Sequence, residues 1–381
     1  MKNIKLSLLL LATLTVMSAA TIMASLPMIS KEFSDIDDII LLSKLMLTLP
    51  ALFIAILAPF SGALIDRYGR LKSLYFGLAL FVIGGTSGIY LNNFWLLLAG
   101  RALLGVGVAF VMTASTTLIG DYFEGEARNK FMGLQGAFTA IGGVFFVGGG
   151  GLLADIDWRG PFYIYFVPLL FLPLLLKSLY EPKKHHHEEH ITPKVFSLQL
   201  MVIYITAFLL MIIIYLLPTQ MPFLIIDGMG GKPSSVAMIV AFAMSISALT
   251  AVNYSKFKRH LSFGSIFGMN FLLLSIGLYL ISQATTFPLF FLGAGFTGSG
   301  MGLMMVNINS WMLAHAPKSI RGKVTGFTVS AIFLGQFASP LSFEIIIKNL
   351  GLQGLFYLVS INLLVIAIMI FTLKLYQRLR A

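Results

Sequence analysis

The chain has 381 residues, of which 58% are hydrophobic and only 11% are charged, and its mean hydropathy is +0.91. This balance excludes an ordinary soluble globular domain and indicates an integral membrane protein. The formal net charge of +11 therefore indicates contact with anionic lipid and not with nucleic acid. The sequence has no cysteine, which excludes disulfide and thiolate chemistry.

Apolar runs follow one another along the chain, each close to the roughly 20 residues that a helix needs to cross about 30 Å of hydrocarbon. The first run has some features of a secretory signal, because Lys2 and Lys5 precede it and Ser18-Ala19-Ala20 could be cleaved. We interpret it as a span, since the apolar run continues past that point. The sequence thus predicts twelve transmembrane helices, at 4–28, 39–64, 74–91, 94–120, 131–153, 162–179, 196–221, 234–254, 263–282, 287–313, 324–347 and 354–375.

The basic residues predict the orientation of these spans. With both termini in the cytoplasm, 20 of the 26 Lys and Arg residues lie on the cytoplasmic side and five on the outer side or at outer helix ends. This split satisfies the positive-inside rule with an even number of spans. We therefore expect a multi-pass protein of the plasma or inner membrane with both termini inside.

The same half occurs twice in the chain, in the same orientation. The repeated residues are 193 positions apart: Gly100, Gly105, Gly107, Arg128, Lys130, Gly133 and Gly142 recur as Gly293, Gly298, Gly300, Arg321, Lys323, Gly326 and Gly335. The duplication predicts an all-α membrane protein with two pseudo-symmetric six-helix bundles, at 1–180 and 196–381. Two such bundles can rock about a site between them, which is the usual basis of alternating access.

Residues 181–195 form the longest polar interruption and are predicted to connect the bundles in the cytoplasm. Four histidines in this stretch could also bind zinc or nickel. We favour a solvated connector, because no turn chemistry fixes a tetrahedral geometry there. The metal candidates are His185, His186, His187 and His190.

A glycine-rich basic loop follows the second predicted span. It reads Gly62-Ala63-Leu64-Ile65-Asp66-Arg67-Tyr68-Gly69-Arg70-Leu71-Lys72 and resembles the loop between helices two and three that marks the major facilitator superfamily. Leu98, Arg101, Gly105 and Gly107 are similar to the intramembrane arginine motif of its proton-coupled members. The resemblance covers nearly the whole chain and points to the twelve-helix drug/proton antiporter branch.

The resemblance implies that Asp66 and Arg70 form a charge cluster with Asp121 at the end of helix four. In the family, such a cluster latches helix two to helix eleven and is released when the cavity changes sides. The alternative is that these residues only set the topology. We favour the latch, because an aspartate adds little to the positive-inside effect.

Arg101 is predicted to lie about 10 Å inside helix four, counted from Phe94 at 1.5 Å per residue. A guanidinium at that depth costs at least about 2.5 kcal/mol unless it faces protein or a wet cavity. We therefore expect Arg101 to act in coupling. The alternative is an arginine whose side chain reaches back to the outer headgroups.

Two departures from the drug-exporter pattern weaken the case for proton antiport. The segment Ser18 to Pro27 of helix one has no acidic residue, and Phe146-Val147 stands where antiporters usually have a Gly-Pro step in helix five. Carboxylates remain near the outer side, and Glu344 alone lies inside an apolar span. Glu344 is therefore a further coupling candidate, since burial can bring the pKa of a carboxyl near neutrality.

The presumed cavity between the bundles is apolar and adaptable, which suits a hydrophobic or amphipathic solute. We predict a secondary active transporter, not an enzyme, that works by proton-coupled efflux, without a cofactor and as a monomer. The alternatives are uptake or facilitated transfer of a metabolite, or lipid transport. The predicted cavity residues are Met23, Met112, Thr116, Phe138, Met301, Met305, Asn309, Phe333 and Gln336.

Overall fold

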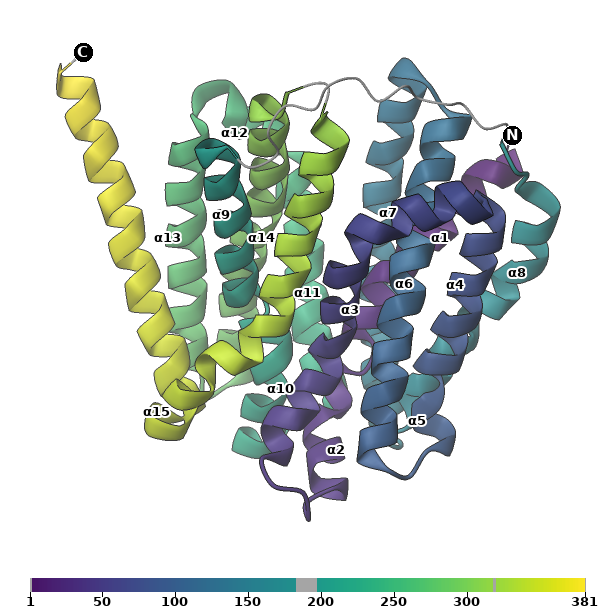
Figure 1. Ribbon diagram of the computed structural model, residues 1–381. Helices are drawn as coiled ribbons and strands as arrows, with labels where there is room; N and C mark the ends of the chain where they lie inside the picture. The colour runs from purple at the N-terminus through teal and green to yellow at the C-terminus, as the bar shows by residue number, and fades with distance from the viewer. Residues whose placement is uncertain (1, 183–196, 318–319, 381) are drawn as a thin grey trace.

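The computed structural model describes residues 2–182, 197–317 and 320–380. The first half of the chain makes six membrane crossings. They are built from α1 (Lys2–Ala20), η1 (Met23–Ser25), α2 (Leu26–Glu32), α3 (Ile39–Tyr68), α4 (Arg70–Gly85), α5 (Ser87–Tyr90), α6 (Phe94–Tyr122), α7 (Gly125–Ala154), η2 (Gly160–Phe166) and α8 (Val167–Ser178) (Figure 1).

The second half repeats this arrangement, and its last helix is a merged pair. Gly351 interrupts α15 with a φ of 69° and a ψ of 179°, a conformation that glycine adopts without steric cost. The chain turns back there, so the 11 apolar helical segments make the twelve predicted crossings (Figure 1). The elements are α9 (Leu198–Ile214), α10 (Leu216–Met229), α11 (Pro233–Val252), α12 (Tyr254–His260), α13 (Phe263–Ser282), α14 (Phe287–His315) and α15 (Arg321–Arg380).

Polar residues at the membrane boundary begin several helices. The Asn93 side chain accepts hydrogen bonds from the backbone N–H groups of Trp95 and Leu96 at the start of α6. The Ser262 hydroxyl accepts the N–H of Ser265 at the start of α13. These caps satisfy donors that the first helical turn leaves free.

Close helix contacts are repeated in the two halves. A Cβ added at Gly84 or at Gly105 would come closer than 3.0 Å to the carbonyl oxygens of Gly100 and Pro50, respectively. The same holds 193 residues later, where Gly277 meets Gly293 and Gly298 meets Ala243. Small residues let backbones approach in a bilayer, where helices associate by packing. The duplication in the sequence is therefore a duplication of contacts.

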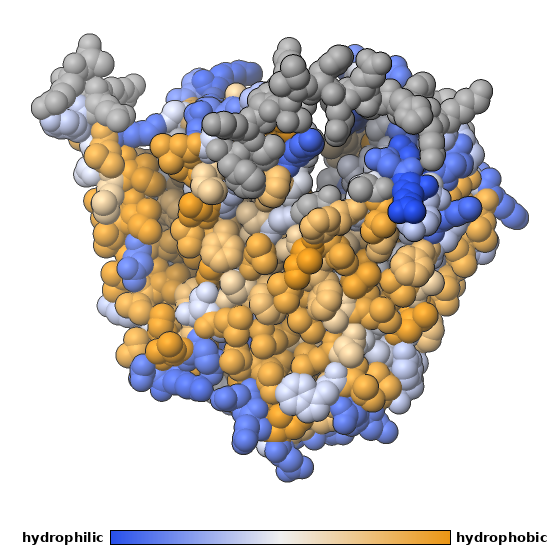
Figure 2. Space-filling view, viewed as in Figure 1, coloured by the Kyte–Doolittle hydropathy of each residue, from blue (hydrophilic) through white to orange (hydrophobic). Residues whose placement is uncertain are grey.

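The two bundles lie side by side, with both termini at the same end of the molecule (Figure 1). We call that end the terminal side and the opposite end the distal side. Figure 2 shows a broad apolar belt between polar residues at the two ends. The belt and the lengths of the helices identify a multi-pass membrane protein.

Candidate functional site

A cavity of about 210 Å³ lies between the two bundles. It adjoins the points where the first and seventh spans are broken, between α1 and η1 and between α9 and α10. None of the side chains around it is formally charged. Its walls are Thr15, Val16, Ala19, Ala20 and Met23 of the first half and Ile214, Tyr215, Leu217, Pro218, Val240, Ala243, Met244, Met301, Phe333 and Gln336 of the second.

Gln336 on α15 gives this apolar cavity a polar group. Its Oε1 is buried and has no hydrogen-bond partner among the described residues. An unsatisfied buried acceptor costs free energy. A ligand in the cavity could relieve that cost by donating one hydrogen bond, while methionine and aromatic side chains contact its apolar part.

Four of the nine predicted cavity residues line this cavity, namely Met23, Met301, Phe333 and Gln336. On α14, Met305 and Asn309 follow Met301 by one and two turns toward the terminal side. The others, Met112, Thr116 and Phe138, also lie outside its lining. Thr116 and Asn309 are exposed and bond to carbonyl groups of their own helices. Their part in binding stays a prediction.

The interface between the bundles has close contacts at the distal end of α7, whereas two glycines at the terminal ends of α7 and α15 have open space beside them. At the distal end of α7, Gly150 contacts Thr21 of the same half and Gly151 contacts Ala237 of the other half. At the terminal ends, a Cβ added at Gly133 of α7 or at Gly326 of α15 would meet no atom within 4 Å.

Ion pairs between the bundles are recorded at the distal side in the part of the chain that the structure describes. Lys31 Nζ lies 2.7 Å from Asp227 Oδ1, and Lys348 Nζ lies 3.2 Å from Asp38 Oδ1. A third contact joins Lys44 Nζ to Glu344 Oε2 at 4.0 Å. The backbone N–H of Ser234 also donates to Asp155 across the interface. These contacts tie the two halves together on the distal side.

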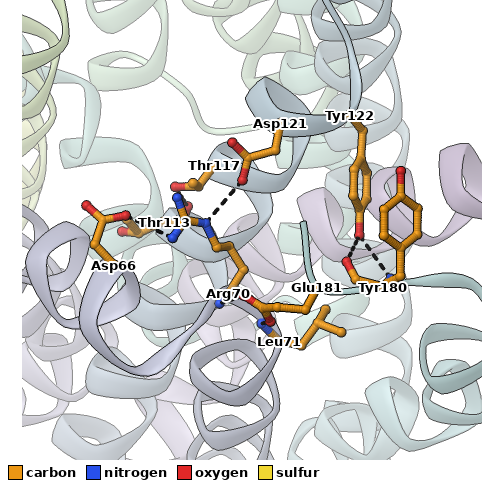
Figure 3. Close-up of polar contacts among 9 residues, drawn as sticks. All are labelled: Asp66, Arg70, Leu71, Thr113, Thr117, Asp121, Tyr122, Tyr180 and Glu181. Atoms are coloured by element: carbon orange, nitrogen blue, oxygen red, sulfur yellow. Dashed lines mark hydrogen bonds and ion pairs between the residues drawn. The ribbon is translucent and has the colours of Figure 1, made fainter. Parts of the chain in front are cut away.

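The predicted charge cluster forms at the terminal end of the first bundle (Figure 3). Arg70 NH1 lies 3.1 Å from Asp66 Oδ1, and Arg70 Nε donates to Asp121 Oδ2, also at 3.1 Å. Gly69, with a φ of 101°, separates α3 from α4 and lets Arg70 turn between the two carboxylates. The predicted cluster residues therefore do meet.

Glu181 belongs to the same cluster and was not singled out from the sequence. Its carboxylate accepts the backbone N–H groups of Arg70 and Leu71 at 2.6 and 2.8 Å (Figure 3). It thus caps the first turn of α4, where backbone donors and the helix dipole favour an anion. The sequence signal was weak, because cap and helix are over 100 residues apart.

The predicted latch to helix eleven is not formed by this cluster in the described residues. The recorded ion pair of Asp66 is with Arg70, and its side chain is largely exposed. Helix α3 does pack along α15, and the Ser330 hydroxyl donates to the carbonyl oxygen of Ala55 at 3.0 Å. A link from Asp66 to α15 stays a prediction for a state closed at the terminal side.

Arg101 is fully buried inside the first bundle. Its guanidinium donates to the carbonyl oxygens of Met46 and Ser18 at 3.0 and 2.6 Å. A third bond goes to the Tyr165 hydroxyl at 2.9 Å. The side chain therefore does not reach the headgroups, and it joins α1, α3 and η2.

The partners of Arg101 explain why a side chain with several hydrogen-bond donors is needed at this position. Met46 would normally accept the N–H of the residue four positions later, but that residue is Pro50, which has none. Ser18 lies in the last turn of α1, where carbonyl groups lack helical partners. The proline was the sequence signal for this role. In the second half, Ala243 and Ala294 replace Pro50 and Arg101, so proline and arginine are absent together.

The metal candidates His185, His186, His187 and His190 lie outside the described residues. Within the described ranges, no group of three or more His, Asp and Glu side chains is placed to hold a metal ion.

Two duplicated six-helix bundles with a cavity at their interface are the architecture of a membrane transporter. The model of the Major Facilitator Superfamily matches residues 8–340, and the chain belongs to that family. It is therefore a transporter and not an enzyme.

The chain is similar to several curated transporters. It is 36% identical over 107 residues to Protein spinster homolog 3 of Danio rerio and 33% identical over 111 residues to Multidrug resistance protein 2 of Bacillus subtilis (strain 168). These matches cover 27% and 28% of the chain and only 22% and 27% of those proteins. The Bacillibactin exporter of the same bacterium is 25% identical over 85% of both chains.

A solved structure supports the fold. The crystal structure of a D-xylose-proton symporter superposes with a TM-score of 0.77 and covers 97% of this chain and 96% of its own. The sequence identity is 15%, so this likeness concerns the architecture alone.

Neutralising Asp66 tests whether the charge cluster takes part in transport. We expect Asp66→Asn to slow transport by about fivefold, a typical size for coupling between sites, while the protein still inserts and folds. The control is Glu126→Gln, which removes an exposed pair with Lys130 at the same end of the bundle. Unchanged rates in both Asp66→Asn and Asp121→Asn would show that the cluster has no part in transport.

Proposed function

We propose that this protein exports hydrophobic or amphipathic small molecules from the cytoplasm in exchange for protons. The observation that carries the proposal is the cavity between the bundles, with its uncharged, methionine-rich and aromatic walls and one unpaired amide oxygen. Such a wall suits solutes that have a large apolar surface and a hydrogen-bond donor. It offers no cation for an organic phosphate.

The direction of transport is proposed from the orientation and from the relatives. The terminal side carries most of the basic residues and is taken as the cytoplasmic side of a plasma or inner membrane. In this orientation, solutes would enter the cavity from the terminal side and leave at the distal side. The names of two relatives, a multidrug resistance protein and an exporter, agree with this direction.

Proton coupling is proposed from the charged groups that lie where the bundles must move. Glu344 faces the other half at the distal side, and the cluster of Asp66, Arg70 and Asp121 lies at the terminal side. The contacts of Arg101 favour a role in holding the first bundle together. A direct part for Arg101 in proton transfer stays a prediction.

The test is substrate movement into proteoliposomes across an imposed pH gradient, with a panel of lipophilic cations and neutral amphiphiles. Labelling of Asn93→Cys from outside measures the fraction of molecules in the proposed orientation. Antiport predicts uptake when the lumen is acidic. Uptake only when the lumen is alkaline would show symport, and no response to the gradient would exclude proton coupling.

Gln336→Leu is expected to raise the half-saturating concentration of a hydrogen-bonding substrate by about threefold to tenfold, the value of one hydrogen bond. Gln220→Leu is the matched control, because Gln220 is also buried without a partner among described residues but does not line the cavity. Equal effects of the two substitutions would contradict recognition by Gln336.

Uptake or facilitated transfer of a metabolite, or lipid transport, is the second candidate. Two sequence features favour it, namely the missing acid in helix one and the Phe146-Val147 step in helix five. Helix α1 lines the cavity, and α7 contacts α11 of the other half. The two departures therefore lie on helices that bound the cavity or the interface between the bundles.

A further inference from the structure

A buried lysine lies at the interface between the two bundles, on the distal side. The Lys44 side chain on α3 is only 1% exposed. Its Nζ lies 4.0 Å from Glu344 Oε2 on α15 and 5.1 Å from the ring centroid of Phe223 on α10. Glu344 Oε2 is itself buried and accepts no hydrogen bond from the described residues. The two charges thus depend on each other across the moving interface.

The burial of this pair separates it from the other distal ion pairs. In the pairs of Lys31 with Asp227 and of Lys348 with Asp38, both side chains are at least one-third exposed. Exposed pairs of this kind contribute little, because water already solvates both partners. A buried ammonium that loses its counter-ion is strongly unfavourable until water reaches it. Lys44 and Glu344 therefore dominate the electrostatics of distal closure.

Water has a route to this pair. A cavity of about 560 Å³ lies beside it at the distal side, between α3, α10 and the turn in α15 at Gly351. Lys44, Phe223 and Asp227 contribute to its walls. A proton from the distal solution can therefore approach the pair without crossing the central cavity.

The charges that face Glu344 are balanced only while its carboxyl is ionised. Lys44 faces it from α3, and Lys348 lies 3.8 Å from its Oε1 on α15 itself. Farther out, Asp38 pairs with Lys348, and Asp227 of α10 pairs with Lys31 of α2. One proton on Glu344 leaves Lys44 buried without a counter-ion.

We propose that Lys44 and Glu344 form a proton-sensitive closure of the distal side. With Glu344 ionised, the pair holds α3 against α15 and keeps the distal side shut. With Glu344 protonated, hydration lowers the free energy of the Lys44 ammonium, and the bundles separate at that end. The inference rests on the proposed function in one respect, namely that the distal side faces the cell exterior. With that orientation, acid outside the cell favours the state that is open to the outside.

The experiment measures the distance between spin labels on the distal loops of the two halves. Ser34 and Thr285 are exposed there, and the chain has no cysteine to remove before both are changed to cysteine for labelling. In purified protein in lipid nanodiscs, we expect the short distance to dominate at about pH 7.5. At about pH 4, where glutamate carboxyl groups take up protons, the ratio of long to short distances should rise by at least fivefold, the lower end of typical coupling.

Variants assign the response to this pair. Glu344→Gln should give mostly the long distance at both pH values, because Lys44 is then buried without a counter-ion. Lys44→Met removes the buried ammonium, so its distances should no longer change with pH. The exchange Lys44→Glu with Glu344→Lys should restore the short distance at the higher pH. Lys31→Met is the control for an exposed pair and should behave like the wild type. Size-exclusion profiles check that each variant is folded.

Two results would overturn the inference. One is a pH response that persists in Glu344→Gln, which would place proton binding elsewhere, for example at Asp38 or Asp227. The other is a wild-type distance that does not change with pH. The distance measurement needs no substrate, so a failure of the export assay would not affect it. Likewise, a failure of the distance measurement would not contradict export.

Discussion

Replacing Arg101 by alanine is expected to lower the thermal stability of the purified protein more than any other single substitution considered above. Three buried acceptors, on Met46, Ser18 and Tyr165, lose their donor. Interhelical hydrogen bonds in membranes average about 0.6 kcal/mol each with a maximum near 1.7, and charge-assisted bonds are stronger. A loss of about 2–5 kcal/mol would lower the melting temperature by roughly 5–15 °C.

A double substitution separates this explanation from a simple loss of charge. Pro50→Ala restores a backbone N–H that can bond to the Met46 carbonyl, so removing Arg101 should cost about 1 kcal/mol less in that background. Arg101→Lys should rescue only partly, because an ammonium lacks the planar fork that reaches three acceptors. Melting curves at one scan rate are the measurement. Additive effects of Pro50→Ala and Arg101→Ala would contradict the role assigned to the proline.

Adding a single methyl group at Gly105 or Gly298 is the second change with a large expected effect. In both places the new Cβ would lie closer than 3.0 Å to backbone atoms of a neighbouring helix, and backbone cannot move aside as a flexible side chain can. Overpacking of this kind typically costs about 1–3 kcal/mol. We expect Gly105→Ala and Gly298→Ala to lower the melting temperature by similar amounts, because the contacts are equivalent by the internal repeat.

Gly148→Ala is the matched control for these substitutions. It also lies inside a membrane helix, but no atom is within 4 Å of its added Cβ. Alanine favours helix over glycine by up to about 1 kcal/mol, so this variant should be as stable as the wild type or more so. A loss of stability equal to that of Gly105→Ala would show that helix packing is not the cause.

The sequence predicted the architecture because bilayers and internal repeats leave strong one-dimensional signals. Apolar length defined the spans, and the spacing of 193 residues between Gly105 and Gly298 defined the two bundles. The same spacing relates their contacts with Pro50 and Ala243. The loop motif also predicted a contact correctly, since Arg70 forms ion pairs with both Asp66 and Asp121.

The partners of charged side chains were much harder to predict. Counting basic residues placed Lys44 only near an outer helix end, and nothing in the pattern indicated that it turns inward to meet Glu344 of the other half. The direction of a side chain depends on how helices are rotated against each other, which hydropathy does not record. Arg101 was recognised as unusual, but its partners are backbone carbonyl groups, and only Pro50 could have revealed one of them.

The cavity was predicted in part for a similar reason. Met301 and Gln336 line it, whereas Asn309 shares α14 with Met301 but does not reach the cavity, and Met112 lies on α6, which contributes no lining residue. A helix offers several faces, and the choice among them depends on its neighbours.

Glu181 has a practical consequence for modifying this protein. It is the first residue of the connector, yet both of its carboxylate oxygens hold the first turn of α4. A displacement of the backbone at Glu181 would therefore break the hydrogen bonds to Arg70 and Leu71 and disturb the loop that contains Arg70. Tags, fusion partners or protease sites should therefore be inserted after Pro182, so that the first bundle keeps its own cap and the inserted sequence carries the strain.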